Sequence, residues 1–389
     1  MTSSTRRLDP DRAARVTLSR VGEPGDPRLT GLVAELGALT VLAALREQGA
    51  RGQLRDDHAA RLERVDPGAE LERAARLGIR FVTPDDEEWP PALDDLAHAP
   101  CLHERGGPPM GLWVKGPARL ADLAERSVAV VGSRSATTYG ASVAAEIGAA
   151  LGEAGHTVVS GAAFGIDQAA HRGALAVEGP TVAVLACGVD RAYPAAHREL
   201  LDYIADVGAV VSEAAPGCAP TRIRFLARNR LIAALSRGTV VVEAAIRSGA
   251  LNTANWAAGL SRALMGVPGP VTSAPSAGVH QLIRGRGALL VTNGAEVLEA
   301  VAPAGEHTVP LQHEPPQARD LLTPEQRQVL DAVPLRRGAV TAKIAHTAGL
   351  APQRVEDALS TLHAAGLVER SDGRWRLAAG PRLAVAPVG

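Results

Sequence analysis

Runs of consecutive apolar residues recur in the middle of the chain, and each run is followed by a stretch with helical spacing. These runs are rich in β-branched side chains and lie at Val128–Val131, Thr157–Val159, Val182–Leu185, Ala209–Val211, Thr239–Val242, Leu264–Val267 and Leu289–Val291. Strands that are apolar throughout are typical of a parallel sheet covered by helices on both faces. The pattern therefore predicts an α/β fold, an extended Rossmann-like, doubly wound parallel sheet, over residues 127–301.

The residues before this region show helical spacing interrupted by Gly/Pro turns. The predicted helices lie at Arg12–Val21, Leu29–Leu36, Ala38–Glu47 and Ala69–Leu77. We therefore predict a helical N-terminal module over residues 1–80. A connecting segment with short strands follows over residues 81–126, and the strand patterns in this part of the chain are Gly78–Thr83 and Leu112–Gly116.

The C-terminal part begins with a Pro-rich stretch, residues 302–322, which we interpret as a linker. Thr323-Pro324 then forms an N-cap signal with Pro at the first helical position. Two further helices and a short hairpin pattern follow in the sequence. Helix–turn–helix plus hairpin predicts a winged helix over residues 323–380.

The composition narrows the class of protein. The chain has 389 residues, 46% of them hydrophobic and 21% charged, so it is not globally disordered. The net charge of -1 gives no sign of a nucleic-acid partner for the molecule as a whole. Three widely spaced cysteines and the lack of a signal peptide or membrane-length run lead us to expect a cytoplasmic protein that binds no membrane.

Two glycine-containing turns follow the first two predicted strands and carry the groups of an anion site. They are Gly132-Ser133-Arg134 and the turn with Ser160, Gly161 and Gly165. Helix N-termini, hydroxyls and guanidinium groups bind phosphates, although the glycines also suit a plain tight turn. The second turn matches neither common phosphate loop, so we expect a ligand other than an ordinary dinucleotide or a hydrolysed nucleoside triphosphate.

The segment between Arg222 and Arg286 carries a one-sided charge. It holds nine arginines, Arg228 and Arg230 among them, and its only acid is Glu243, a net charge of +8. Positive charge beside aromatic rings suits a strand of phosphates with exposed bases. Only 3% of the residues are aromatic. The stacking candidates are Phe164 and Phe225, and burial in the core is about as frequent a role for Phe.

Enzymatic interpretations of the sequence are weaker. Asp167 and His171 have the spacing of an acid–base pair, but a capping Asp and an ordinary polar His are favoured. Cys187 follows a strand without a recognisable base and is interpreted as a small buried residue. Neither His-x-x-x-His nor Cys-x-x-Cys occurs. We therefore expect no catalytic residue, cofactor or metal.

Together the motifs between about 128 and 290 resemble the DNA-processing protein A family, DprA/Smf. The matching stretches, in order, are Val131-Gly132-Ser133-Arg134, Ser160-Gly161-x-Ala163-x-Gly165-Ile166-Asp167, Cys187-Gly188-Val189-Asp190, Ser212-Glu213, Phe225-x-x-Arg228-Asn229-Arg230-x-Ile232-Ala233, Val241-Val242-Glu243-Ala244 and Ser248-Gly249-x-Leu251-x-Thr253-Ala254. The flanks are similar to the family's N-terminal module, of the SAM or helix-hairpin-helix kind, and to its winged helix. Two positions depart from the family pattern: Leu226, where Pro is usual, and Asn252, where a β-branched residue is usual.

The resemblance implies a homodimeric, non-enzymatic protein that binds single-stranded DNA in a positive pocket. Members of the family protect incoming DNA and load the recombinase RecA during natural transformation. Carried onto this chain, the resemblance implies a pocket lined by Ser133, Arg134, Gly161, Asn229, Arg230, Ser248 and Gly249.

Two other functions stay open at this stage. One is a sensor or enzyme for a free nucleotide that uses the same pocket, with Glu243 at the end of a strand as its carboxylate. The other is a winged-helix transcription factor with an α/β sensor domain. The helix Gln353–Ala365 counts against the latter, because it sets Arg354 against Glu356 and Asp357.

Overall fold

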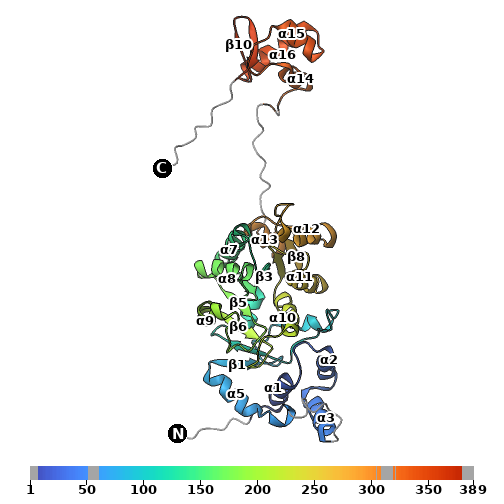
Figure 1. The fold of residues 1–389 in the computed structure, drawn as a ribbon, viewed down its shortest axis with the longest axis vertical. Coiled ribbons are helices and arrows are strands. Elements are labelled where there is room, and N and C mark those ends of the chain that lie inside the picture. The colour runs from blue at the N-terminus through green and yellow to red at the C-terminus, as the bar shows by residue number, and fades with distance from the viewer. Residues whose placement is uncertain (1–7, 51–60, 304, 308–318, 320, 379–389) are drawn as a thin grey trace. The chain divides into compact units, whose positions relative to one another are not determined.

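The computed structural model describes residues 8–50, 61–303, 305–307, 319 and 321–378 in two compact units, Met1–Val309 and Pro310–Gly389 (Figure 1). Most of the predicted linker lies outside the described residues. The limits of the predicted domains stay predictions.

The first unit is built on a sheet whose described strands have the order β1-β2-β6-β5-β4-β3-β7-β8-β9. The strands are β1 (Ile79–Val82), β2 (Leu112–Lys115), β3 (Ser127–Val131), β4 (Thr157–Ser160), β5 (Thr181–Val184), β6 (Ala209–Ser212), β7 (Gly238–Val241), β8 (Ala263–Gly266) and β9 (Leu289–Leu290). From β6 to β9 every neighbouring pair is parallel, which confirms the predicted α/β class. β2 pairs antiparallel with β6, so the same sheet continues across the expected limit at residue 126.

Helices cover both faces of this sheet, as the uninterrupted apolar strands predict. They include α6 (Leu120–Glu125), α7 (Thr138–Glu153), α8 (Ile166–Ala176), α9 (Arg198–Val207), α10 (Arg222–Ala234), α11 (Ala250–Gly259), α12 (Ala274–Arg286) and α13 (Gly294–Val301). On β3, Val128 and Val130 belong to the core beneath α7 and α8. Ala129 and Val131 belong to the core beneath α10 and α11. Figure 1 shows the two pairs of helices on opposite sides of the strands.

Glycines bring α7 and α8 unusually close together. A Cβ at Gly148 would lie 2.4 Å from the Ala170 carbonyl oxygen, and a Cβ at Gly173 would lie 2.1 Å from the Ala145 carbonyl oxygen. Side chains are therefore excluded where the two helices cross. The close contact of α7 and α8 fixes the position of this pair of helices beside β3 and β4, whose carboxyl ends lie at the candidate site.

The predicted N-terminal helices are present as α1 (Pro10–Val21), α2 (Pro27–Leu36), α3 (Ala38–Ala50) and α5 (Pro67–Arg76). Three of them begin in the same way, because Asp9, Asp26 and Asp66 accept hydrogen bonds from backbone N–H groups and Pro occupies the first turn. Val16 of α1 lies in one core cluster with Phe81 of β1, so the module packs against the sheet.

The second unit contains α14 (Pro324–Ala332), α15 (Thr341–Ala348) and α16 (Pro352–Ala364), followed by the antiparallel hairpin β10 (Val368–Ser371) and β11 (Arg374–Leu377). Thr323 is the N-cap of α14, as its sequence predicts, and it also forms a capping box with Gln326. Trp375 is buried among the three helices and closes their core. These are the elements that the sequence predicts, and the designation of winged helix stays a prediction.

No single helix among the described residues is long and apolar enough to cross a membrane. Only the bent pair of α2 and α3, taken together, has the length and apolar composition of a membrane-spanning segment.

The crossing of α7 and α8 gives a test of the packing. We expect Gly173→Ala to lower the free energy of unfolding by about 1–3 kcal/mol, because the new methyl group forces the two helices apart. The measurement is urea unfolding followed by circular dichroism. Gly285→Ala is the matched control, since position 285 is also helical and a Cβ there meets nothing within 4 Å. Equal stability of the two variants would contradict the close packing.

Candidate functional site

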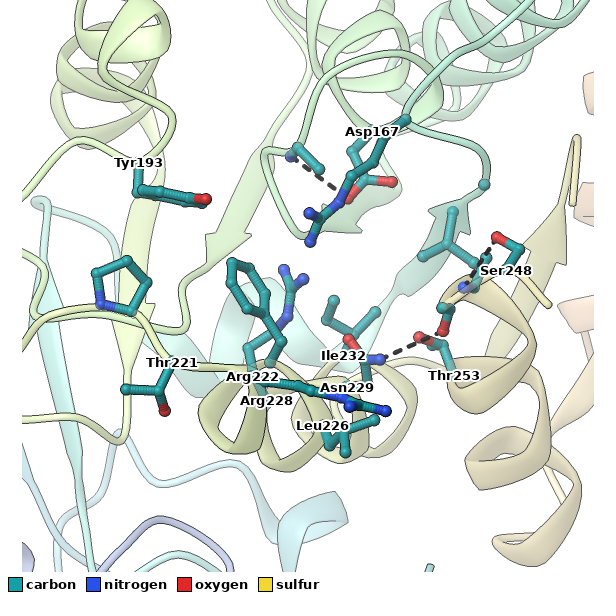
Figure 2. Close-up of a pocket in the computed structure, with 18 residues that line it drawn as sticks. Asp167, Tyr193, Thr221, Arg222, Leu226, Arg228, Asn229, Ile232, Ser248 and Thr253 are labelled. Atoms are coloured by element: carbon teal, nitrogen blue, oxygen red, sulfur yellow. Dashed lines mark hydrogen bonds between the residues drawn. The ribbon is translucent and has the colours of Figure 1, made fainter. Parts of the chain in front are cut away.

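A pocket of about 660 Å³ opens at the carboxyl ends of the central strands (Figure 2). It lies where the strand order reverses, because β4 and β7 are the two neighbours of β3. Ligands of open parallel sheets bind at such reversal points. The lining residues are Val131, Gly132, Arg134, Ala163, Asp167, Tyr193, Pro220, Thr221, Arg222, Phe225, Leu226, Arg228, Asn229, Ile232, Ser248, Gly249, Ala250 and Thr253.

The turn after β3 contributes Arg134 to this pocket. The Arg134 side chain is exposed, and its Cζ lies 4.8 Å from the centre of the Phe225 ring. Ser133 is not among the lining residues, and its backbone joins neighbouring segments. Its N–H donates to the Glu243 carbonyl oxygen over 2.7 Å, and its own carbonyl oxygen accepts from the Ile166 N–H over 3.2 Å. The structure therefore separates Arg134, which faces the pocket, from Ser133, which supports the turn.

Polar groups of the turn after β4 form hydrogen bonds within the protein. This corrects the expectation that its amides and hydroxyl face a ligand. The Ser160 hydroxyl is buried and donates to the Val130 carbonyl oxygen over 2.6 Å. The Gly161 N–H donates to Asp167 Oδ2 over 3.1 Å, so it is already used. Gly165 has a φ of 78° and packs on the Ser133 carbonyl oxygen. The sequence identifies the turn but not the internal partners of its polar groups.

Gly161 has a different role, which is to make room for Arg228. A Cβ at position 161 would lie 1.7 Å from Arg228 Nη1. The same nitrogen donates to the Val184 carbonyl oxygen over 2.8 Å, while Nε of Arg228 has no partner among the described residues. Burial lowers the pKa of Arg228 to about 10, partly offset by the charge of Asp167, so the guanidinium stays protonated at neutral pH. Burial also raises the pKa of Asp167.

Helix α10 forms another wall and begins at the N-cap Thr221. Its Phe225 ring is surrounded by Arg134, by Arg228 with Cζ 5.8 Å from the ring centre, and by the Tyr193 ring with a centroid distance of 5.6 Å. Arg222 on the same helix is exposed and also lines the pocket. Cations stacked on a ring beside open space suit a ligand with both phosphates and bases.

The far wall is the start of α11, where Ser248 and Gly249 line the pocket as expected. Asn229 is held there by its amide nitrogen, which donates to Asn252 Oδ1 over 3.2 Å and to the Gly249 carbonyl oxygen over 3.4 Å. Asn252 is one of the two departures from the family pattern, and here it positions Asn229. The other departure, Leu226, lines the pocket itself.

Arg230 requires a correction, because it does not line the pocket. Its side chain is 0% exposed and forms a two-fold ion pair with Glu213, over 2.7 and 2.8 Å. Two other arginines of the segment Arg222–Arg286, Arg224 and Arg262, also pair with acids outside it. Their partners are Glu23 and Asp95. The charge of +8 thus overstates the positive field, since tertiary partners neutralise part of it.

Phe164 also lies apart from the pocket lining. It is 47% exposed, and its ring meets the His197 ring edge-on with a centroid distance of 4.6 Å. Tyr193 and Arg222 line the pocket but were not selected from the sequence. Tyr193 could have been found from its place after β5, at the same edge of the sheet as the two glycine turns.

Of the candidate catalytic groups, Asp167 lines the pocket, whereas Glu243, His171 and Cys187 do not. The Glu243 carboxylate accepts hydrogen bonds from the Thr137 N–H over 2.9 Å and the Thr137 hydroxyl over 2.6 Å, at the start of α7. His171 is fully buried and bonded to the Thr181 hydroxyl, not to Asp167. Burial raises the pKa of Cys187 to about 11, which disfavours a thiolate. Among the described residues no His, Cys, Asp and Glu cluster could hold a metal ion.

The fold and the pocket define an α/β protein with an arginine-lined pocket at the reversal point of its sheet. Residues 80–302 match the sequence model of DNA recombination-mediator protein A. A putative DNA processing protein DprA from Mycobacterium tuberculosis is 46% identical over 376 residues, 95% of each chain. The chain therefore belongs to the DNA recombination-mediator protein A family, DprA/Smf.

More distant members agree with this assignment. The DNA processing protein DprA from Streptococcus pneumoniae is 41% identical over 213 residues, which cover 55% of this chain and 71% of that protein. The X-ray structure of DprA from Streptococcus pneumoniae superposes with a TM-score of 0.61 at 31% identity, over 75% of this chain and 98% of that one.

The burial of His171 predicts a dependence of stability on pH. Burial lowers the pKa of His171 to about 3, from the ordinary 6.5, so between these values the unfolded chain binds a proton that the folded chain does not. The contribution of this group to the free energy of unfolding therefore falls as the pH falls, by on the order of 2 kcal/mol from pH 7 to pH 5. Urea unfolding of His171→Gln should show a shallower pH dependence than the wild type.

The exposed His103 provides the matched control for this measurement. We expect His103→Gln to follow the wild type over the same pH range. An unchanged slope in His171→Gln would show that His171 is not held neutral in the folded protein.

Proposed function

We propose that this protein is a recombination mediator that binds single-stranded DNA in the pocket at the reversal point of its sheet. The observation that carries the proposal is the Phe225 ring flanked by Arg134 and Arg228 at the wall of an open pocket of about 660 Å³. The family to which the chain belongs supports the same role.

In this proposal the arginines bind the phosphates of the strand and the aromatic rings contact its bases. Arg134 and Arg222 bind successive phosphates, since both are exposed at the pocket and guanidinium groups hold phosphate through paired hydrogen bonds. Phe225 and Tyr193 provide faces on which bases stack, a mode that tolerates any sequence. The more buried Arg228 adds positive charge at the floor of the pocket.

The further steps rest on membership of the family. We propose that the protein protects incoming DNA during natural transformation, loads the recombinase RecA onto it and acts as a homodimer. The protein would hold the strand rather than react with it, which agrees with the engagement of the Glu243 carboxylate by Thr137, the N-cap residue of α7. That engagement also counts against the alternative of a nucleotide-cleaving enzyme.

Oligonucleotide binding across a range of salt concentrations tests the site. We expect Arg134→Ala and Arg222→Ala each to weaken binding of a mixed-sequence single strand roughly tenfold. Each variant should also reduce the slope of log affinity against log salt by about 0.7, because one phosphate contact is lost per single-stranded site. Fluorescence anisotropy with a labelled oligonucleotide measures both quantities.

Arg284→Ala is the matched control, because Arg284 is an exposed arginine of α12 that does not line the pocket. It should keep both the affinity and the slope of the wild type. The assignment is wrong if the Arg134 and Arg222 variants behave like this control. Turnover of a free nucleotide that Glu243→Gln abolishes would favour the enzymatic alternative instead.

The proposed loading of RecA has its own test. The protein should shorten the lag before RecA filaments form on a single strand covered by single-stranded-DNA-binding protein. Arg134→Ala should lose most of this effect, because the mediator must hold the strand first. An equal lag with and without the wild-type protein would contradict RecA loading and leave DNA binding intact.

A further inference from the structure

Helix α10 carries the pocket residues on one side and contacts a second segment on another. Arg222, Phe225 and Asn229 point to the pocket. Arg224, Ala227 and Arg230 recur at intervals of three residues and so share a different side of the helix. This second side meets the loop that joins α1 to α2, residues 22–26.

An ion pair joins the loop to the first turn of α10. Arg224 Nε donates to Glu23 Oε2 over 2.9 Å, and Nη2 donates to Glu23 Oε1 over 3.0 Å. The Arg224 side chain is 15% exposed and the Glu23 side chain 36%. The two-fold geometry fixes the direction of the guanidinium as well as its distance. The turn that it holds is the one that carries Arg222 and Phe225.

The same loop also touches the middle of α10 through Gly25. Gly25 has a φ of 66°, and a Cβ there would lie 3.2 Å from Arg230 Cζ and 3.4 Å from Ala227 Cβ. Its N–H donates to Glu213 Oε1 over 3.4 Å, the carboxylate that pairs with Arg230. Arg230 Nε donates to the Gly107 carbonyl oxygen over 3.0 Å. The loop, the buried ion pair and α10 thus form one packed unit.

We propose that residues 22–26 are a positioning element of the DNA pocket. Through the pair of Glu23 with Arg224, this loop holds the first turn of α10 in the orientation that presents Arg222 and Phe225 to the strand. The inference rests on the proposed function, and it makes Arg224 and Arg230 positioning residues rather than DNA ligands. Neither arginine lines the pocket. The N-terminal helices thereby influence DNA affinity without contacting DNA.

Reversing the charge at position 23 distinguishes a positioning role of the loop from direct electrostatic attraction of DNA. Glu23→Arg replaces an acid by a base, so a purely electrostatic effect would tighten DNA binding and steepen its salt dependence. If residues 22–26 act by positioning α10, Glu23→Arg should instead weaken DNA binding. We expect about threefold to tenfold weaker binding of a single-stranded oligonucleotide with the salt slope of the wild type, because no phosphate contact is removed.

Exchanging the charges of Glu23 and Arg224 should rescue DNA binding. Arg224→Glu alone should weaken binding in the same way, and the double variant Glu23→Arg with Arg224→Glu should restore most of the wild-type affinity. If Arg224 itself contacted a phosphate, the double variant would stay weak and its salt slope would fall. Glu35→Arg is the control for charge, since Glu35 is an exposed acid of α2, and it should not weaken binding.

Stability and hydrogen exchange separate positioning from unfolding. All affinities are measured at a temperature at which thermal melts show each variant folded, and amide exchange in Arg222–Ala227 is followed without DNA. Faster exchange there in Glu23→Arg, reversed by the charge swap, is the expected result. Wild-type affinity in Glu23→Arg would overturn the inference while the proposed function stands. A wild-type protein that binds no oligonucleotide would overturn both.

Discussion

The guanidinium of Arg228 lies in the space that a side chain at position 161 would occupy, and the architecture of the pocket depends on this contact. Gly161 directly follows β4 and Arg228 belongs to α10, so the contact joins the sheet edge to the helix that forms the opposite wall. The hydrogen bond from Arg228 to the Val184 carbonyl oxygen extends the connection to β5. The buried charge of Arg228 requires polar partners, and groups at the ends of the strands provide them.

The arginines of this protein divide into two groups by their partners. Arg224, Arg230 and Arg262 pair with Glu23, Glu213 and Asp95, all outside their own segment. Arg134 and Arg222 are exposed at the pocket. The first group joins α10 and the residue before β8 to carboxylates elsewhere in the first unit, and the second group is open to a ligand. Arginines of this segment that have a carboxylate partner thus serve the fold, whereas exposed arginines at the pocket are available to the site.

The fold was largely predictable because local patterns carry it. Strands such as Val128–Val131 are apolar throughout, and the helices after them begin at recognisable caps, as at Thr137 and Thr221. The location of the site was also predictable, because turns after parallel strands meet at one edge. The roles of individual site residues were less predictable. Ser160, Gly161 and Arg230 have the right chemistry for an anion, but their polar groups face other parts of the protein.

The sequence was therefore sufficient to predict the class of fold, the edge of the sheet at which the pocket opens and the family. Each of these follows from periodicity, from turn residues or from the order of several motifs along the chain. The three-dimensional arrangement was needed to show which arginines of the described residues lack a carboxylate partner, which side of α10 faces the pocket and that Glu243 accepts hydrogen bonds from Thr137, the N-cap of α7. The reason is that these properties depend on partners from other elements of the fold, which for Glu243 with Thr137 and for Arg224 with Glu23 lie more than 100 residues away in the chain.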